Sequence, residues 1–242
     1  MLQGKICLVT GSSEGIGAAI ARCFAQEGAT VFAAARRDNL IEEWVQENSL
    51  QEKIIPVKMD VTDPNQIKQC IMRIKKEYGR LDVLVNNAAV EENDSIGAIT
   101  RAAMQNMFET NVYGVIDLIQ LASRLMRKNG GSIINITSRV GENGNAGQLV
   151  YSATKGAVIA LTKSAAKELT PLGIRVNAVS PGLTETAMYH KTPKDKLESR
   201  LQRIMLGRPA TPEEIADSVL FLASEKSGYV SGHILNVDGC VT

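Results

Sequence analysis

Three side chains near the middle of the chain have the types and spacing needed to move a proton. Tyr151 and Lys155 are four residues apart, so on a helix they share one face and lie within reach of one another. A lysine ammonium favours a phenolate, so it is expected to lower a phenol pKa of about 10. A Tyr in such surroundings can donate or accept a proton near neutral pH. Ser138, approaching from a separate strand end, would hold the oxygen that is protonated.

A glycine-rich turn near the N-terminus has the features of a phosphate-binding loop. Residues 5–10 form a short apolar segment typical of a buried parallel strand, and the turn Gly11–Gly17 follows it. A helical pattern comes next, and residues 30–35 predict a second strand. In such a βαβ unit, glycines let the backbone turn tightly and approach a pyrophosphate, which sits on the helix N-terminus. The pattern therefore predicts a dinucleotide site.

The end of the second strand bears on which dinucleotide binds. Dinucleotide folds that use NAD place an acidic residue near this point to hold the ribose 2′-OH, whereas Arg accommodates the 2′-phosphate of NADP. Arg36 and Arg37 stand here and no acid does, which favours NADP(H). Glu14 argues the other way, because a carboxylate in the phosphate-side turn would repel a 2′-phosphate. NAD(H) therefore stays open as the alternative.

The rest of the chain continues the alternation of strands and helices. We predict an α/β fold with one doubly wound, Rossmann-type parallel sheet of about seven strands, helices on both faces, and a single domain over residues 1–242. A long helical region over 100–128 contains Asn111, which either caps or kinks the helix or holds something. Residues 183–208 are polar and basic, and predict a mobile flap with a short helix at 194–205. The remaining predicted strands are 53–59, 81–86, 132–137, 173–179 and 233–237.

Composition and charge exclude several classes of function. The 242 residues carry 27 basic and 26 acidic side chains, a net charge of +1, and neither sign forms a block that would attract nucleic acid or an anionic membrane. Two distant histidines and four scattered cysteines argue against a metal site or a disulfide framework. No apolar stretch reaches membrane-spanning length. We expect a soluble, cytoplasmic protein with no metal.

Taken together, these motifs resemble the short-chain dehydrogenase/reductase family over essentially the whole chain. The resemblance rests on their order and spacing, since Tyr-x-x-x-Lys alone is a weak signal. Residues 141–150 and 206–239 are most similar to 3-oxoacyl-[acyl-carrier-protein] reductases of fatty acid biosynthesis. The motifs are Thr10–Gly17, Asn86–Ala89, Asn111, Ser138, Tyr151 with Lys155, and Pro181-Gly182.

The resemblance implies an NADPH-dependent reduction of a ketone to a secondary alcohol. Tyr151 would be the general acid, Lys155 would lower its pKa and hold the nicotinamide ribose, Ser138 would position the carbonyl, and Asn111 would anchor a water in a proton relay. It also implies a homotetramer. The implied cofactor contacts are Gly11, Ser13, Gly15, Ile16 and Gly17 at the pyrophosphate, Arg36 and Arg37 at the 2′-phosphate, Asp60 and Val61 at adenine, Asn87 and Ala88 at the ribose, and Pro181, Gly182 and Thr184 at the nicotinamide amide.

Some positions depart from the 3-oxoacyl reductase pattern. Asn129 and Leu172 stand where those reductases often carry basic residues that meet the acyl carrier protein, so that partner is left open beside a small-molecule or acyl-thioester ketone. Arg139 follows Ser138 directly and would put a charge at the pocket mouth; the alternative is that Arg139 and Glu142 form a solvated loop pair. The alternatives are an NAD(P)-dependent secondary-alcohol or hydroxysteroid dehydrogenase and, in another class, a cofactor-binding sensor without turnover.

Overall fold

Seven strands form one sheet in the order β3-β2-β1-β4-β5-β6-β7, and every neighbouring pair is parallel. The computed structural model describes residues 1–190 and 194–241. The predicted doubly wound sheet is therefore confirmed. The strands are β1 (Ile6–Thr10), β2 (Thr30–Ala35), β3 (Ile54–Lys58), β4 (Val83–Asn86), β5 (Gly131–Ile136), β6 (Ile174–Pro181) and β7 (Ile234–Val237).

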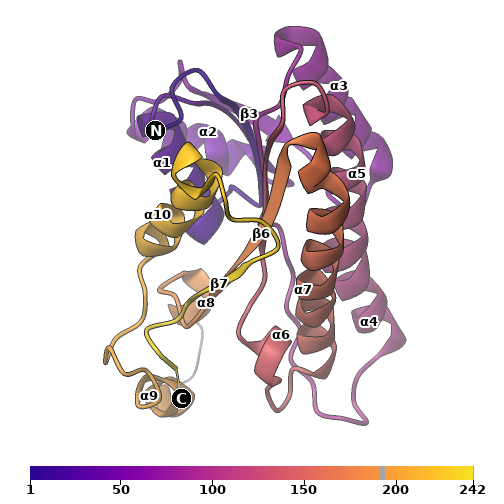
Figure 1. Cartoon of the computed structure of the whole chain (residues 1–242). Helices are drawn as coiled ribbons and strands as arrows, with labels where there is room; N and C mark the ends of the chain where they lie inside the picture. The colour runs from indigo at the N-terminus through magenta and orange to yellow at the C-terminus, as the bar shows by residue number, and fades with distance from the viewer. Residues whose placement is uncertain (191–193, 242) are drawn as a thin grey trace.

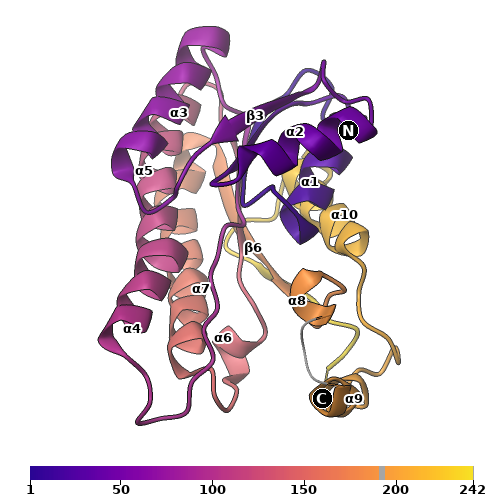
Figure 2. The ribbon, with the colours of Figure 1, turned by 180° about the vertical axis from the view of Figure 1, so that it is seen from behind.

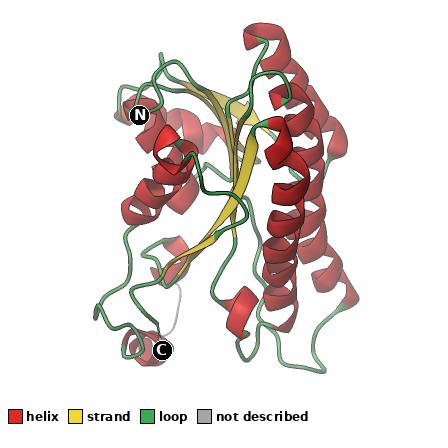
Figure 3. Ribbon diagram, in the orientation of Figure 1, coloured by secondary structure: helices red, strands yellow, loops and turns green. Residues whose placement is uncertain are grey.

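Helices cover both faces of the sheet and bury an apolar layer on each side. Helices α1, α2 and α10 pack on one face, and α3, α5 and α7 on the other (Figure 1; Figure 2 shows the reverse side). Figure 3 shows the sheet nearly edge-on between these two layers. The bounds of these helices are α1 (Gly15–Gln26), α2 (Asp38–Glu47), α3 (Pro64–Tyr78), α5 (Gly114–Met126), α7 (Leu149–Leu169) and α10 (Pro212–Ala223).

The strand order reverses between β1 and β4, and this switch point places the predicted motifs side by side. The turn after β1 and the segment Asn87–Ala88 after β4 meet at the carboxyl edge of the sheet, where open α/β sheets bind ligands. Asn87 joins them directly, since its Nδ2 donates to the Thr10 carbonyl at 3.0 Å and to the Gly11 carbonyl at 3.1 Å.

The long helix predicted over residues 100–128 is interrupted at its middle. Helix α4 (Arg101–Phe108) leads into a π-helical turn, Glu109–Tyr113, and α5 follows it. A π-helical turn inserts one extra residue into a helix and is frequent at functional sites. Asn111 lies in this turn and is only 1% exposed. Of the interpretations open from the sequence, both a disruption of the helix at Asn111 and hydrogen bonds from its side chain to other segments are observed.

Two further segments differ from the sequence-based expectation. A short helix, α6 (Val140–Asn143), follows Ser138 and is not among the predicted elements, and α9 (Lys194–Leu201) ends earlier than the predicted residue 205. The predicted flap also contains α8 (Ala187–His190), and its residues 191–193 lie outside the described residues. The flap's mobility stays a prediction. No helix in the described part of the chain is long and apolar enough to cross a membrane.

Candidate active site

Two cavities adjoin at the carboxyl edge of the sheet. The larger, of about 440 Å³, is lined by Ser138, Tyr151 and Lys155 together with residues from the glycine-rich turn. The smaller, of about 290 Å³, lies beyond the same turn, on the side of the β2 end. Glu14 and Asn87 line both cavities, so the two form one continuous crevice that crosses the N-terminus of α1.

Ser138 is held close to α7 by a tight contact between its own loop and that helix. Strand β5 ends two residues before it, and the Thr137 hydroxyl donates to the Lys155 carbonyl at 3.0 Å. A Cβ on Gly141 would lie 2.7 Å from the Lys155 carbonyl carbon, so only glycine lets α6 approach α7 this closely. The predicted delivery of Ser138 from a separate strand to the Tyr151 helix is thus observed.

Tyr151 and Lys155 share one face of α7, as their spacing predicts. The Lys155 Nζ lies 5.6 Å from the centre of the Tyr151 ring and donates to the Ile136 carbonyl at 2.9 Å. Lys155 is only 3% exposed, and this burial lowers its pKa to about 8, with Glu91 opposing the shift. The side chain therefore stays mostly charged at neutral pH but gives up its proton more readily than a free lysine.

The expected lowering of the Tyr151 pKa by Lys155 is not found in the protein alone. Burial raises the pKa of the Tyr151 phenol above its usual value, and the negative charge of Glu91 raises it further. The expectation failed because it counted the ammonium and not the loss of water around both groups. A raised phenol pKa keeps Tyr151 protonated at neutral pH and makes it a weaker acid than a free tyrosine in the protein alone.

Asn111 lies outside both cavities and holds two segments of the site together. Its Oδ1 accepts from the Val90 amide at 2.8 Å, and its Nδ2 donates to the Val90 carbonyl at 2.8 Å and to the Thr154 hydroxyl at 3.1 Å. Both amide hydrogens are therefore used within the protein. The side chain fixes the segment after β4 against α7, and its relay role stays a prediction.

The glycine-rich turn fits a bound pyrophosphate. A Cβ on Gly17 would lie 2.2 Å from the Gly11 carbonyl oxygen, so the turn closes only with glycine there. The N-cap residue of α1 is Glu14, and its side chain makes no capping hydrogen bond, which leaves first-turn N–H groups available to an anion. The predicted phosphate-side residues divide between the two cavities, with Gly11 and Ser13 lining the smaller and Gly15, Ile16 and Gly17 the larger.

The smaller cavity gathers the residues predicted for the adenosine. Among them, the Arg37 Nη2 lies 2.9 Å from the Glu14 Oε1, and both side chains are more than half exposed. The Asp60 Oδ1 accepts hydrogen bonds from the backbone N–H and the hydroxyl of Thr62, so that oxygen stabilises a local turn. The lining also includes Arg36, Val61, Asn87 and Ala88.

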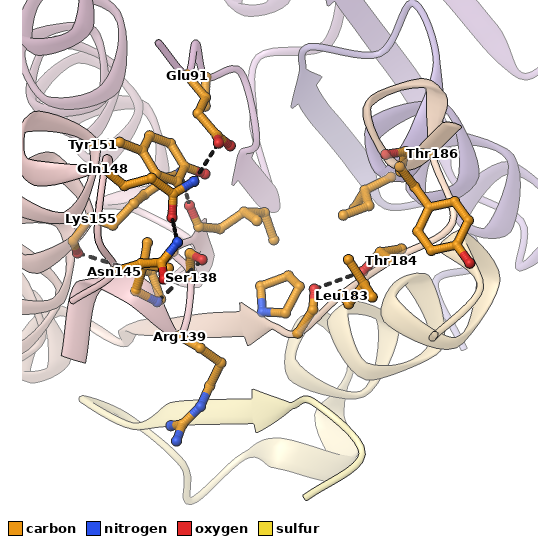
Figure 4. Close-up of a pocket in the computed structure, with 18 of the residues that line it drawn as sticks. Glu91, Ser138, Arg139, Asn145, Gln148, Tyr151, Lys155, Leu183, Thr184 and Thr186 are labelled. Carbon is orange, nitrogen blue, oxygen red and sulfur yellow. Dashed lines mark hydrogen bonds between the residues drawn. The ribbon is translucent and has the colours of Figure 1, made fainter. Parts of the chain in front are cut away.

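The opposite wall of the larger cavity comes from the end of β6 and the residues after it. Pro181, Gly182 and Thr184 line the cavity there, as predicted, and the Thr184 hydroxyl donates to the Gly182 carbonyl at 3.2 Å. Figure 4 shows Thr184 and Thr186 across the cavity from Tyr151 and Lys155. No cluster of three or more metal-ligating side chains occurs among the residues that the structure describes.

Arg139 is neutralised by acidic partners on the protein. It pairs with Glu142, and its Nε lies 2.8 Å from the Asp238 Oδ2, a residue that follows β7. Figure 4 shows the side chain extending from the Ser138 loop toward the C-terminal segment. The predicted charge at the pocket mouth is therefore largely cancelled, because two carboxylates from different segments converge on it.

Sequence reasoning missed two residues that the fold brings to the site. Glu91, after β4, lines the larger cavity, and Gln148 at the N-terminus of α7 donates to its carboxylate. In addition, Trp44 on α2 lies outside both cavities, yet its Nε1 donates to the Ser12 carbonyl at 3.2 Å and so holds the glycine-rich turn. Glu91 could have been singled out as a carboxylate close behind the Asn86–Ala89 motif.

Comparison with known proteins finds relatives that match nearly the whole chain. A family model described as Enoyl-(Acyl carrier protein) reductase matches residues 11–242. The chain is 43% identical over 240 residues to a 3-oxoacyl-[acyl-carrier-protein] reductase FabG of Thermotoga maritima, covering 98% of both chains. It is 37% identical to the protein of that name from Escherichia coli (98% of this chain, 97% of the relative) and 37% identical to a 3alpha-hydroxysteroid dehydrogenase of Mediterraneibacter gnavus (99% and 97%).

Proposed function

This chain belongs to the short-chain dehydrogenase/reductase family, and from that premise we propose that it reduces a ketone to a secondary alcohol with NADPH. The family makes it an NAD(P)-dependent oxidoreductase. The observation that carries the proposal is that Ser138, Tyr151 and Lys155 line one cavity next to the glycine-rich turn. A sensor without turnover has no need of all three groups in that arrangement.

In the proposed reaction the bound nicotinamide supplies a hydride to the carbonyl carbon. Tyr151 is protonated at neutral pH and donates its phenolic proton to the carbonyl oxygen, because the alkoxide that hydride addition forms is a stronger base than the phenolate. The Ser138 hydroxyl donates a hydrogen bond to the same oxygen and orients it. Lys155 holds the nicotinamide ribose and stabilises the phenolate left on Tyr151, and Asn111 takes part in returning a proton to it.

We propose NADP(H) as the preferred cofactor, because Arg36 and Arg37 line the adenosine cavity and no acidic residue stands at the end of β2. The remaining contacts are assigned as the sequence predicts. Gly11, Ser13, Gly15, Ile16 and Gly17 hold the pyrophosphate, Asp60 and Val61 the adenine, Asn87 and Ala88 the ribose, and Pro181, Gly182 and Thr184 the nicotinamide amide.

We propose a 3-oxoacyl thioester as the substrate class, on the strength of relatives named for that activity at 37–43% identity. Docking of an acyl carrier protein would use Arg124, Arg127 and Lys128, which are exposed at the C-terminal end of α5 and just beyond it. A hydroxysteroid is the second candidate. The observation in its favour is that the 3alpha-hydroxysteroid dehydrogenase is as similar, at 37%, as the Escherichia coli reductase.

A substrate panel tests the proposal. Purified protein is given acetoacetyl thioesters, small diketones, cyclic ketones and steroids, each with NADPH and with NADH. Among these compounds we expect the highest kcat/KM for an acetoacetyl thioester with NADPH. A steroid preference would select the second candidate, and failure to reduce any ketone with either cofactor would overturn the proposal.

We further propose a single catalytic domain, a cytoplasmic location and a homotetramer. The four cysteines are free, as expected in a reducing compartment. Large apolar side chains stand exposed around α4, α5 and α7, at Tyr113, Ile116 and Leu149, which supports pairing of these helices between copies. Sedimentation analysis tests the tetramer, and a monomer at micromolar concentration would contradict it.

A further inference from the structure

One carboxylate in the substrate cavity has no part in the proposed reaction. Glu91 lies in the segment after β4 and lines the larger cavity with Tyr151 and Lys155. Its Oε1 accepts from the Asn93 Nδ2 at 2.9 Å and from the Gln148 Nε2. Gln148 is in turn held by the Asn145 Nδ2 at 2.7 Å. Figure 4 shows Glu91, Gln148 and Tyr151 on the same side of the cavity.

The position of Glu91 is fixed by the frame that positions Tyr151. The preceding residue, Val90, is bound through both its N–H and its carbonyl to the Asn111 side chain, which also contacts Thr154 on α7. Gln148 stands three residues before Tyr151 and is only 6% exposed. The carboxylate is therefore pre-organised relative to the phenol, as a substrate-recognition group has to be.

In the described part of the chain, only one of the two oxygens of the Glu91 carboxylate is hydrogen-bonded. Both amide donors use Oε1, and within residues 1–190 and 194–241 no hydrogen bond to Oε2 and no ion pair of Glu91 is found. Its negative charge acts on both reacting groups. It adds to the raised pKa of Tyr151, and it partly offsets the lowering of the Lys155 pKa by burial. The contrast with Arg139 is direct, because that charge is already cancelled by Glu142 and Asp238.

We propose that Glu91 is a specificity-determining residue that accepts a hydrogen bond from an O–H or N–H group carried by the ketone substrate near its carbonyl. The inference rests on the proposed ketone reduction but not on the 3-oxoacyl thioester, which has no O–H or N–H beside its ketone; it points instead to a hydroxy or amido ketone. A substrate with such a donor forms a hydrogen bond to the Glu91 Oε2. An analogue that lacks the donor leaves this charged acceptor unpaired in a partly desolvated cavity. An anionic group at the same place is repelled.

Matched substrates test the donor. 1-Hydroxy-2-butanone is compared with 1-methoxy-2-butanone, which keeps the electron-withdrawing oxygen and loses only the O–H. 1-Acetamido-2-butanone and its N-methyl derivative form the corresponding pair for an N–H donor. The quantity measured is the ratio of kcat/KM within each pair, so differences in overall activity between variants cancel. Whichever pair shows the effect identifies the source of the donor.

The ratio is measured in the wild-type protein, in Glu91→Leu and in Glu91→Gln. We expect the ratio for at least one pair to fall by roughly tenfold or more in Glu91→Leu, because a hydrogen bond to a charged group is lost. Glu91→Gln keeps a neutral acceptor and should fall in between. Glu92→Leu is the matched control, since Glu92 is an exposed neighbour that pairs with Asn106 outside the cavity, and its ratios should equal those of the wild type.

A second comparison tests the charge even if Glu91→Leu fails to fold. Glu91→Gln should raise kcat/KM for the anion acetoacetate relative to methyl acetoacetate by several fold, because it removes the repulsion and keeps the side chain's size. Equal ratios in wild type and variants that do reduce ketones would overturn the inference alone. A wild-type protein that reduces no ketone would overturn the proposed function, and the inference with it.

Discussion

At the catalytic end of the crevice, Lys155 is 3% exposed and the Tyr151 phenol lies against it, whereas at the adenosine end Arg37 and Glu14 face each other with 60% and 57% of their side chains exposed. The pKa of each catalytic group is shifted by burial. The exposed pair is bound through an ion contact that water and salt weaken. The properties of the catalytic end thus depend on the burial of its titrating groups, whereas cofactor selectivity at the adenosine end depends on exposed charges.

This difference predicts how each end responds to substitution. A buried group cannot be replaced without removing a reaction step or changing the pH dependence of stability. An exposed charge pair contributes about 0–1 kcal/mol, so changing it should adjust preference without abolishing function. The expected effects therefore decrease from the proton donor to the Arg37–Glu14 pair.

The largest effect is expected for Tyr151→Phe. This change removes only the hydroxyl, so kcat should fall by roughly 10²- to 10⁴-fold while the Kd for NADPH changes little. Steady-state kinetics and a fluorescence titration of NADPH measure the two quantities. A variant that kept most of the wild-type activity would show that the proton comes from another group.

Gly17→Ala should disrupt the junction between the two ends. The new Cβ would lie 2.2 Å from the Gly11 carbonyl oxygen and 2.5 Å from the Asn87 Nδ2, so the turn must open, at a cost of about 1–3 kcal/mol in unfolding free energy and a weaker cofactor complex. Urea unfolding and NADPH titration measure these losses. Gly228→Ala, where the nearest atom is the Glu225 carbonyl oxygen at 3.2 Å, should cost less in both measurements. Equal losses in the two variants would contradict the account.

Lys155→Met should change how stability depends on pH. The Lys155 pKa is about 8 in the folded protein against 10.5 for the free side chain, so between these values the unfolded chain binds more protons and wild-type stability rises with pH. We expect the wild type to gain about 3 kcal/mol relative to Lys155→Met between pH 7 and pH 10.5. Urea unfolding across this range measures it, with the exposed Lys163→Met on the same helix as control. Parallel stability curves would contradict the burial of a titrating lysine.

The smallest effect is expected for Glu14→Gln. Releasing Arg37 from its ion pair leaves the guanidinium available to a 2′-phosphate, so the ratio of kcat/KM for NADPH over NADH should rise by roughly two- to fivefold. The gain should shrink at high salt, because the charges are exposed. Arg37→Ala should lower the same ratio. If neither substitution moves the ratio, Arg37 is not the residue that reads the 2′-phosphate.

The regular part of the fold could be predicted from local patterns. The strand Thr30–Ala35 has the predicted bounds, because an apolar run marks it directly, and equally local signals, a proline in the first turn and Gly79, bound the helix Pro64–Tyr78. The π-helical turn around Asn111 could not be predicted from the sequence. The Asn111 side chain is hydrogen-bonded to Val90 and Thr154, which are far away in the sequence. Local propensity signals only that such an Asn is out of place.

The candidate site was predictable where the residues of a motif stand a few positions apart in the sequence. It was not predictable where charged residues far apart in the sequence come into contact. Tyr151 and Lys155 meet because four residues make about one helical turn. The pairing of Arg139 with Asp238 joins the ends of two different strands, so the sequence alone suggested only a charge at the pocket mouth or a local pair with Glu142. Glu91 was missed although it stands close behind the Asn86–Ala89 motif, and with it one cause of the raised Tyr151 pKa.

The most direct test of the central claim follows the hydride itself. The protein is given its best ketone from the panel together with NADPH carrying deuterium at the transferable position of nicotinamide C4, and the alcohol is examined by mass spectrometry and NMR. The account predicts one deuterium on the carbinol carbon, and none there when the unlabelled cofactor is used in D₂O. A carbinol carbon that takes its hydrogen from solvent would contradict it.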